Sequence, residues 1–419
     1  MHQSHKKVFI IACIVAVGWL NALFAEKYEL VDLISIAIQN SNSMQLEQIQ
    51  KDITDQNYNS AIYDFLPNAD YNLSAQDGTM GRQYNSSLSV SKNIYLNDPT
   101  YFNFKKTRLE KTNSKLEFED KKKEIALNVF YLFIDILQTQ KNINILNENF
   151  LLQKKIYEQI NIQYLNDKKT IYDLQASQID TLTAMTDLLE LEKTLYSKRQ
   201  DLFQMLNTED LGYEFEDIEL SNTDSIENDF TDNNAIKISE NKLKQNKLNI
   251  TSSQLSLYPN IYFGYAYRVG VTDKEANPIF KPKEYDDSYT YGVYFSYPLF
   301  SFLDKGSVHS VQKKQSKMLE INHKDLTSQQ KVKYQQSINE FNIYKQSYEI
   351  YKQKLALSTT HLEIAQKRFE MGLINILDLD KSRIQYLEAQ LSMNSKYYTL
   401  LKKQQELNYL KSNKILDRW

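Results

Sequence analysis

The chain has 419 residues, with 50 Lys and Arg against 53 Asp and Glu and a net charge of −3. This near balance gives no argument for nucleic-acid binding, which would need a basic field, and a mean hydropathy of −0.56 argues against a protein built of many transmembrane helices. The chain contains only 9 Gly and 6 Pro, far below ordinary usage. Few positions can therefore interrupt a helix, and we expect very long helices.

The first 25 residues have the features of a secretory signal peptide. Two lysines precede an apolar run from Val8 to Leu20, and small residues suited to cleavage follow up to Ala25. Cleavage is favoured over an uncleaved anchor, and also over lipidation of Cys13, although that segment superficially resembles a lipoprotein box. Cys13 is the only cysteine, so the mature chain, 26–419, is expected to have no disulfide and no cysteine metal site.

Proline and glycine then gather in two zones, which predict β-hairpins at about 68–97 and 260–300. In the second zone large apolar and aromatic residues alternate with other residues up to Tyr297, with the period of two of a strand. A length of about ten residues suits a tilted strand that crosses a bilayer, and a soluble hairpin with one buried face fits the same pattern. The first hairpin has polar residues at positions suited to a water-facing side: Asn72, Ser74, Ser87 and Ser89.

The long stretches between these zones contain no proline and repeat at one fixed offset. Apolar residues spaced by seven run from Val129 to Tyr164, and again from Tyr334 to Phe369. Six heptads in step indicate the seam of an antiparallel coiled coil. The pattern predicts a duplicated unit of short helix, hairpin, long helix, turn and return helix.

The two repeats cover about 26–208 and 233–412, and an acidic segment, 209–232, joins them; it is interpreted as an exposed loop for most of its length. Four strands per chain cannot close a sheet, and an open sheet edge cannot lie in lipid. If the strands lie in a membrane, the chain must therefore form an oligomer.

Each long helix is predicted to end in a turn, near Asp167 in the first repeat and at Gly372 in the second. The second turn carries a spaced motif, and the hairpin entries Leu66-Pro67-Asn68 and Tyr258-Pro259-Asn260 are duplicated. Over about residues 26–410 this pattern resembles the TolC-type outer-membrane efflux and secretion family. The residues that match the family's turn motif are Ala365, Arg368, Phe369, Gly372, Asp378 and Leu379.

The resemblance implies a mainly α fold with transmembrane β-strands. It implies a homotrimer, in which a 12-stranded β-barrel in the outer membrane continues into a 12-helix α-barrel in the periplasm. The implied function is that of a passive exit duct in a tripartite efflux pump or a type I secretion system. The implied partners are outer-membrane lipid, a periplasmic adaptor protein, and an inner-membrane pump or ABC exporter. No enzymatic activity, cofactor or nucleic acid is implied.

The resemblance also implies that the tunnel narrows at the helix turns, where Asp173, Asp378 and Asp380 would form a ring of carboxylates that attracts cations. A second reading takes Asp173 and Asp378 as helix N-caps, and the two roles are compatible. Some family members close this end with an arginine-centred polar network, whereas apolar residues dominate the second turn here. Closure by apolar contacts is therefore expected, with these candidates: Tyr172, Leu373, Ile374, Ile376 and Leu377.

Motifs for catalysis are missing from the sequence. His309, His323 and His361 lie 14 or more residues apart and are interpreted as lone surface residues, because they cannot form an i, i+4 metal pair. No nucleotide-binding motif occurs, so energy for transport would come from partners. The alternative function is a periplasmic or secreted coiled-coil protein without a pore, and a solute-specific porin is a weaker option because the chain is mostly helical.

Overall fold

The computed structural model describes residues 27–78, 81–95, 97–210, 212, 214–217, 233–273, 286–297 and 302–410. The predicted signal peptide, most of the acidic segment and the final nine residues lie outside these ranges. The chain divides into two units, described separately below. The first unit comprises Met1–Leu46, Lys121–Asp232 and Lys331–Trp419, and the second comprises Glu47–Asp120 and Asn233–Gln330.

Two uninterrupted helices, α4 and α7, dominate the chain, and at a rise of 1.5 Å per residue each is about 100 Å long. No helix among the described residues combines the length and apolar character needed to cross a bilayer. The elements follow in this order: β1 (Lys27–Tyr28), α2 (Leu30–Asn40), α3 (Asn42–Tyr63), β2 (Asn68–Gly78), β3 (Gly81–Tyr95), α4 (Pro99–Leu165), α5 (Ile171–Leu206), β4 (Glu214–Phe215), α6 (Asn234–Leu255), β5 (Asn260–Asp273), β6 (Asp286–Ser296), α7 (Phe302–Glu370) and α8 (Ile376–Leu410).

The element boundaries repeat along the chain. The end of α4 and the start of α5 in the first half recur at one common offset as the end of α7 and the start of α8 in the second. The starts of α3 and β2 recur as the starts of α6 and β5, at a common offset that is slightly smaller. Strands lie in both predicted hairpins.

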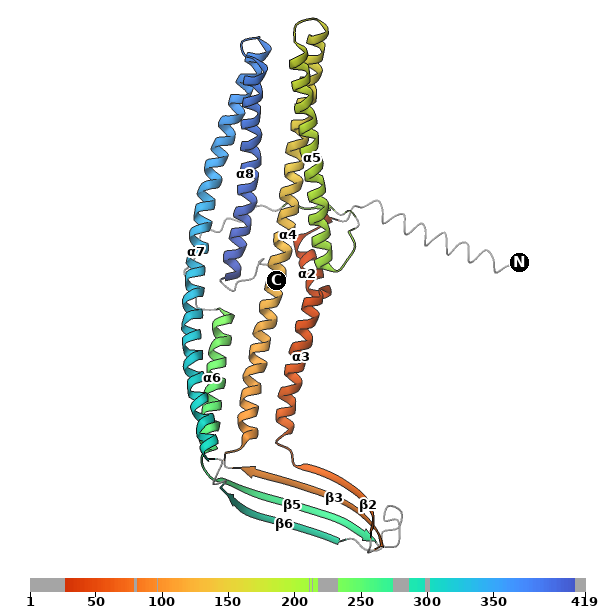
Figure 1. Cartoon of the computed structure of the whole chain (residues 1–419), viewed down its shortest axis with the longest axis vertical. Coiled ribbons are helices and arrows are strands. Elements are labelled where there is room, and N and C mark those ends of the chain that lie inside the picture. The colour runs from red at the N-terminus through yellow and green to blue at the C-terminus, as the bar shows by residue number, and fades with distance from the viewer. Residues whose placement is uncertain are drawn as a thin grey trace, which may run out of the picture. The chain divides into compact units, whose positions relative to one another are not determined.

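The second unit contains a four-stranded antiparallel sheet in the order β2-β3-β5-β6 (Figure 1). The two hairpins join through β3 and β5, which pair over twelve positions from Tyr84↔Asp273 to Tyr95↔Tyr262. Strands β2 and β6 are the edges of this sheet, so each keeps one side of its backbone unpaired within the described chain.

Polar side chains join the helices of the second unit. The Asn241 amide donates to Asn113 Oδ1 over 2.8 Å, which links α6 to α4. Between α6 and α7, His309 Nδ1 lies 3.0 Å from Ser253 Oγ, and His323 Nδ1 lies 3.1 Å from Ser239 Oγ. The interpretation of His309 and His323 as lone surface residues is therefore wrong, because α6 supplies a hydroxyl to each ring. His361 is exposed, as predicted.

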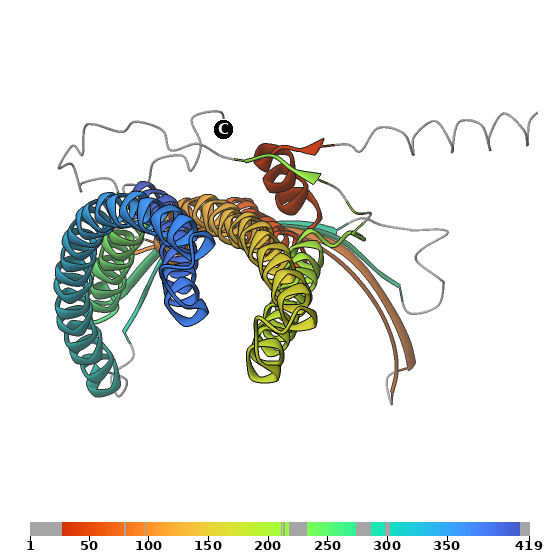
Figure 2. The same ribbon diagram turned by 90° about the horizontal axis from the view of Figure 1, so that it is seen from above.

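The first unit has an apolar core where α2, α4 and α5 meet. Leu33 on α2, Phe133 on α4 and Leu202 on α5 are fully buried. The short strands β1 and β4 pair in parallel beside α2 (Figure 2), and the Phe215 ring of β4 meets the Phe133 ring edge-on at a centroid distance of 5.5 Å. Close packing of these large apolar side chains thus stabilises the junction of α2, α4, α5 and β4.

An ion pair holds the start of the acidic segment against α5. Arg199 donates from Nε and Nη2 to the two carboxylate oxygens of Asp210, both over 2.7 Å, and its guanidinium lies 4.9 Å from the centroid of the Phe215 ring. These hydrogen bonds hold the pKa of Asp210 below its usual range, although burial opposes the shift.

Candidate functional site

The two helix turns of the first unit have the same backbone geometry. In the α4–α5 turn Asp167 has φ 56°, and in the α7–α8 turn Gly372 has φ 73°. The N–H of Lys168 donates to the Gln163 carbonyl over 2.8 Å, and the N–H of Leu373 donates to the Arg368 carbonyl over 2.8 Å. Each helix thus ends in a Schellman motif with its left-handed residue where the sequence predicts the turn.

Asp173 is held by the start of α5. Its N–H donates to Thr170 Oγ1 over 3.2 Å, while the Thr170 N–H and hydroxyl donate to the Asp173 carboxylate over 3.0 and 2.9 Å. The hydrogen bond from the Thr170 N–H, and then that from its hydroxyl, lower the pKa of Asp173. Thr170 is therefore the N-cap, and Asp173 is the third residue of a capping box, which corrects the N-cap reading of Asp173.

The α8 start is capped differently. Asn375 Oδ1 accepts the N–H of Asp378 over 2.9 Å, so Asn375, and not Asp378, occupies the capping position. Asp378 is exposed. Asp380, two residues further on, accepts hydrogen bonds from Arg383 through its Oδ1 atom. The predicted ring candidates thus differ: Asp173 is in a capping box, Asp380 is paired with a cation, and Asp378 is exposed.

The apolar closure candidates divide into two groups. Tyr172, Leu373 and Leu377 are 76%, 64% and 71% exposed, whereas Ile374 and Ile376 pack on a small core formed by α7 and α8. Tyr172, Leu373 and Leu377 can therefore contact another protein surface, whereas Ile374 and Ile376 stabilise the α7–α8 turn itself.

Arg383 is the main residue that sequence reasoning missed. It lies on α8 with 6% of its surface exposed. Its Nε donates to Asp380 Oδ1 over 3.0 Å, its Nη1 donates to Asn149 Oδ1 on α4, and the Gln153 amide of α4 lies against the same guanidinium. An arginine-centred polar network therefore joins the α7–α8 hairpin to α4, and closure of the entrance by apolar contacts stays a prediction.

A second carboxyl faces this network from α5. Burial raises the pKa of Asp180 above its usual range, the negative charge of Asp380 raises it further, and Arg383 partly offsets both effects. Two carboxyl groups thus compete for one buried guanidinium.

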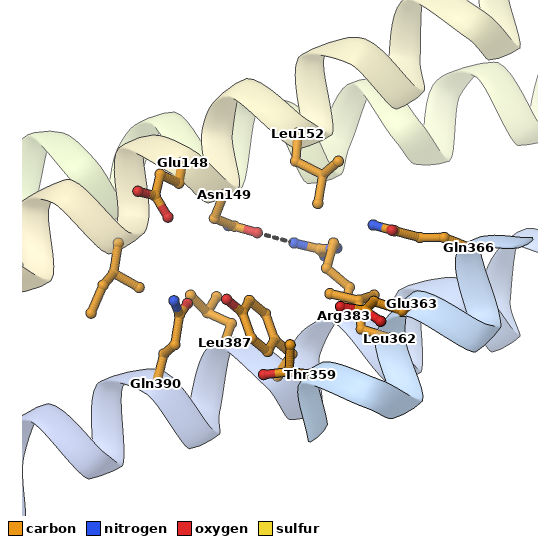
Figure 3. Close-up of a pocket in the computed structure, with 12 residues that line it drawn as sticks. Glu148, Asn149, Leu152, Thr359, Leu362, Glu363, Gln366, Arg383, Leu387 and Gln390 are labelled. Atoms are coloured by element: carbon orange, nitrogen blue, oxygen red, sulfur yellow. Dashed lines mark hydrogen bonds between the residues drawn. The ribbon is translucent and has the colours of Figure 1, made fainter. Parts of the chain in front are cut away.

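A cavity of about 270 Å³ lies beside Arg383 between α4, α7 and α8 (Figure 3). Leu152 and Leu362 supply part of its apolar wall, and Glu148 and Glu363 bring carboxylates to it. Burial, followed by the charge of Glu148, raises the pKa of the Tyr386 phenol in the same wall. The two hairpins are therefore not packed tightly together at this level.

Further polar contacts tie α8 to α4 on the other side of this cavity. The Asn394 amide donates to Asn142 Oδ1 over 2.7 Å, and Lys402 Nζ lies 2.7 Å from Asp135 Oδ1. The α7–α8 hairpin is thus joined to α4 at two levels, at Arg383 and between Asn394 and Lys402.

Two apolar stripes on the first unit are exposed. One lies on α7 and the other on α5, and each has the spacing of a coiled-coil seam. Their side chains are 45% to 74% exposed, so neither seam is covered by the described residues. The members are Ile343, Ile350, Leu357 and Ile364 on α7 with Met371 directly after its end, and Ile179, Leu182, Met185, Leu189 and Tyr196 on α5.

The sheet of the second unit has one apolar and one polar face. Strand alternation and the pairing register place large side chains on one face, where Leu88, Phe263 and Val293 are 51%, 44% and 76% exposed. Apart from Tyr95, Tyr262 and Tyr294 at one end, the opposite face carries small or polar residues, among them the predicted water-facing residues Asn72, Ser74, Ser87 and Ser89. The exposed residues of the apolar face are Tyr71, Leu73, Leu88, Ile94, Ile261, Phe263, Tyr265, Tyr289, Tyr291, Val293 and Phe295.

No group of three or more His, Cys, Asp or Glu side chains within the described ranges could hold a metal ion. The described residues thus form a sheet with an apolar and a polar face, and two helix turns that carry carboxylates.

No family model and no curated protein sequence matches the chain. Solved structures do match it over nearly its whole length. The outer-membrane protein VceC of Vibrio cholerae superposes with a TM-score of 0.82 at 12% identity, over 92% of this chain and 97% of that one. The CmeC outer-membrane channel of Campylobacter jejuni gives 0.82 at 15% identity, over 91% and 85%.

The open state of the MtrE outer-membrane channel of Neisseria gonorrhoeae gives a TM-score of 0.76 at 15% identity, over 92% of this chain and 89% of that one. The long helical hairpins and paired β-hairpins predicted from the sequence pattern are therefore confirmed. The chain has the fold of the TolC-type outer-membrane channels.

Proposed function

We propose that the chain is one subunit of an outer-membrane exit duct that passively conducts solutes delivered from the periplasm. The duct would serve a tripartite efflux pump or a type I secretion system. Its partners would be a periplasmic adaptor and an inner-membrane pump or ABC exporter.

The two-faced sheet is the observation that carries this proposal. A face on which eleven large side chains are exposed is unfavourable in water, since each such side chain contributes about 1.5–3 kcal/mol when buried. Lipid would cover that face, and the opposite face, with Asn72, Ser87 and Ser89, suits a water-filled lumen. The alternation therefore has the form that a membrane wall requires.

The free edges support an oligomer. Strands β2 and β6 would each need a partner strand in lipid, because unpaired backbone groups are costly there. Three copies supply twelve strands, the number that the family resemblance implies. The exposed heptad stripes on α5 and α7 would pair between neighbouring copies and close the helical wall at the same time.

The similarity to solved channel structures supports a location in the outer membrane. The similar solved structures are described as outer-membrane channels, and the predicted signal peptide fits export. At such low identity the likeness establishes the fold, and the duct would lie in the outer membrane and extend into the periplasm.

The helix turns would form the periplasmic entrance. Around a threefold axis, three copies of exposed Asp378 would raise the local concentration of cations. Asp173 would contribute less, because its carboxylate caps α5, and Asp380 is largely neutralised by Arg383. The Arg383 network and the exposed Tyr172, Leu373 and Leu377 would hold this end narrow.

Reconstitution of the purified protein in planar bilayers tests the duct. We expect trimers in detergent and discrete conductance steps. Val293→Arg puts a charge on the apolar face and should prevent insertion, at a cost of up to about 2–4 kcal/mol per subunit, whereas Thr290→Arg on the polar face of the same strand should insert normally. A monomer without conductance, or equal behaviour of the two variants, would favour the poreless coiled-coil alternative.

The ion selectivity of the same channels tests the entrance. Wild-type channels should prefer cations, and Asp378→Asn should weaken that preference more than Asp173→Asn does. An anion preference, or no change in Asp378→Asn, would eliminate the carboxylate ring and leave the duct intact.

A further inference from the structure

Three tyrosines lie in one row across the polar face of the sheet. Tyr95 on β3 is paired with Tyr262 on β5, which is paired with Tyr294 on β6. The Tyr95 and Tyr262 ring centroids are 5.0 Å apart, and so are those of Tyr262 and Tyr294. The second pair is stacked, with 15° between the ring planes. We call these three residues the tyrosine row.

A pair of glycines makes room for the row. Gly264 on β5 pairs directly with Gly292 on β6, in the position next to Tyr262 and Tyr294. A Cβ atom at Gly264 would lie 3.0 Å from Tyr294 Cε2, and one at Gly292 would lie 3.4 Å from the same atom. The Tyr294 ring therefore leans over the two glycines, and a side chain at Gly264 would displace it.

The row is accessible on the polar face. Tyr294 is 41% exposed, and Tyr95 and Tyr262 are partly exposed. On the same face the row is followed by Asn93, Gly264 and Gly292, and the paired positions after those hold only small residues, Ser91, Ala266 and Thr290. A flat molecule can lie against the sheet there without meeting a large side chain.

Stacked rings with an open end favour one class of ligand. Aromatic rings prefer offset-stacked neighbours, and such a pair contributes beyond the area that it buries. Tyr294 lies on β6, an edge strand, so no ring of the described chain continues the stack beyond it. In the proposed duct a β2 strand of a neighbouring copy would lie beside β6, and β2 carries only Asn, Asp, Ser, Gln and Gly on its polar face, which leaves the end of the stack open. A planar aromatic ring could extend the stack at that end by offset stacking on Tyr294.

We propose that the tyrosine row is a binding site for planar aromatic solutes on the wall of the conducting path. The proposal rests on the proposed function, in which the polar face lines the lumen, and it names a class of solute that the duct would hold in passage. Because the rings face the path, the site would act on cargo and not on lipid.

Equilibrium binding in detergent tests this site without a bilayer. The probe is ethidium, a planar aromatic cation, and its fluorescence is titrated with the purified full-length protein. Tetrapropylammonium, a cation of the same charge with no ring, serves as competitor. We expect saturable ethidium binding that tetrapropylammonium does not displace.

Variants then locate the bound probe. Tyr294→Ala should weaken ethidium binding about five- to tenfold, and Tyr294→Phe, which keeps the ring, should bind like wild type. Tyr291→Ala is the matched control, because Tyr291 lies on the same strand but on the apolar face, where it stacks on Tyr289. If Tyr294→Ala fails to fold by circular dichroism, Gly264→Ala takes its place, because its Cβ would displace the Tyr294 ring.

Equal weakening in Tyr291→Ala and Tyr294→Ala, or displacement by tetrapropylammonium, would overturn the site. Channel recordings separate this outcome from failure of the duct. Conductance without row-dependent ethidium binding would refute the site and leave the duct, whereas binding without conductance would refute the duct and leave a stacking site on the sheet.

Discussion

The α4–α5 and α7–α8 hairpins are duplicates with matching boundaries, but they hold their partners differently. The α4–α5 hairpin packs against α2 through fully buried side chains such as Phe133 and Leu202. The α7–α8 hairpin meets α4 through polar contacts, including those of Arg383 and Lys402. The α4–α5 hairpin is thus held by close apolar packing. The α7–α8 hairpin is held by separate hydrogen bonds and ion pairs, which can break and re-form one at a time.

Removal of one core ring should give the largest effect. Phe133→Ala should destabilise the fold by about 3–5 kcal/mol, because it leaves a cavity at a fully buried site. Ile338 occupies the equivalent position on α7 and is only partly buried, so Ile338→Ala should cost about 1 kcal/mol. Thermal unfolding followed by circular dichroism compares the two, and equal losses would show that the two hairpins are held alike.

Removal of the Arg383 guanidinium should be next in size. Arg383→Ala leaves Asp380 and two amides without their donor and should cost about 2–3 kcal/mol; this is below the cost for a fully buried pair, because Asp380 is about a quarter exposed. Gln178→Ala, at the equivalent position on α5, should be nearly neutral. In bilayers Arg383→Ala should also raise conductance, and unchanged stability and conductance would remove the network from any role in closure.

The pH dependence should distinguish two carboxyl groups. The raised pKa of Asp180 means that ionisation opposes this arrangement, so stability should rise as pH falls through that pKa. The pKa of Asp173 is lowered, so its contribution is present above the usual Asp pKa near 4 and is lost on further acidification. As the pH is lowered from about 8, the melting temperature of the wild type should first rise as Asp180 takes up a proton and then fall as Asp173 does. Asp180→Asn should abolish the rise. A rise that persists in the variant would assign it to another group.

The two turns should give the smallest effects, of opposite sign. Gly372→Ala should destabilise by about 1 kcal/mol through its left-handed backbone alone, because a Cβ there meets no atom within 4 Å. Asp167→Gly should stabilise by up to about 0.5–1 kcal/mol, since φ is 56° at that residue. Chemical denaturation measures both, and a loss in Asp167→Gly would indicate that the aspartate side chain itself stabilises the turn.

The architecture could be predicted from local patterns. Clustered Pro and Gly located both hairpins, heptads located the long helices, and left-handed residues located the turns, because each of these signals acts over a few neighbouring positions. The face chemistry of the sheet followed from alternation alone.

Contacts between distant helices could not be predicted in the same way. Asn149 and Arg383 are far apart in the chain, and no periodicity records which helices meet there. One difference between the repeats did point to the Arg383 network. Asp380 and Arg383 stand where the first repeat has Gln175 and Gln178, so α8 has an i, i+3 ion pair that α5 lacks. The histidine contacts had no such signal, since the serines that reach His309 and His323 lie on a different helix.

The lengths of the two β-hairpins, β2–β3 and β5–β6, also show where this chain accommodated additional residues. Strands β2 and β3 begin at Asn68 and Gly81, whereas β5 and β6 begin at Asn260 and Asp286, so the second hairpin has twice the spacing between its strand starts. This extra length accounts for the larger offset at which the later helix boundaries recur. Inside α7 an insertion of the same length would rotate the following seam by about 220° and turn its apolar residues away from their partner helix. The duplicated halves thus diverge in length chiefly between strands, which makes that connection the natural place for lineage-specific insertions and for grafted tags.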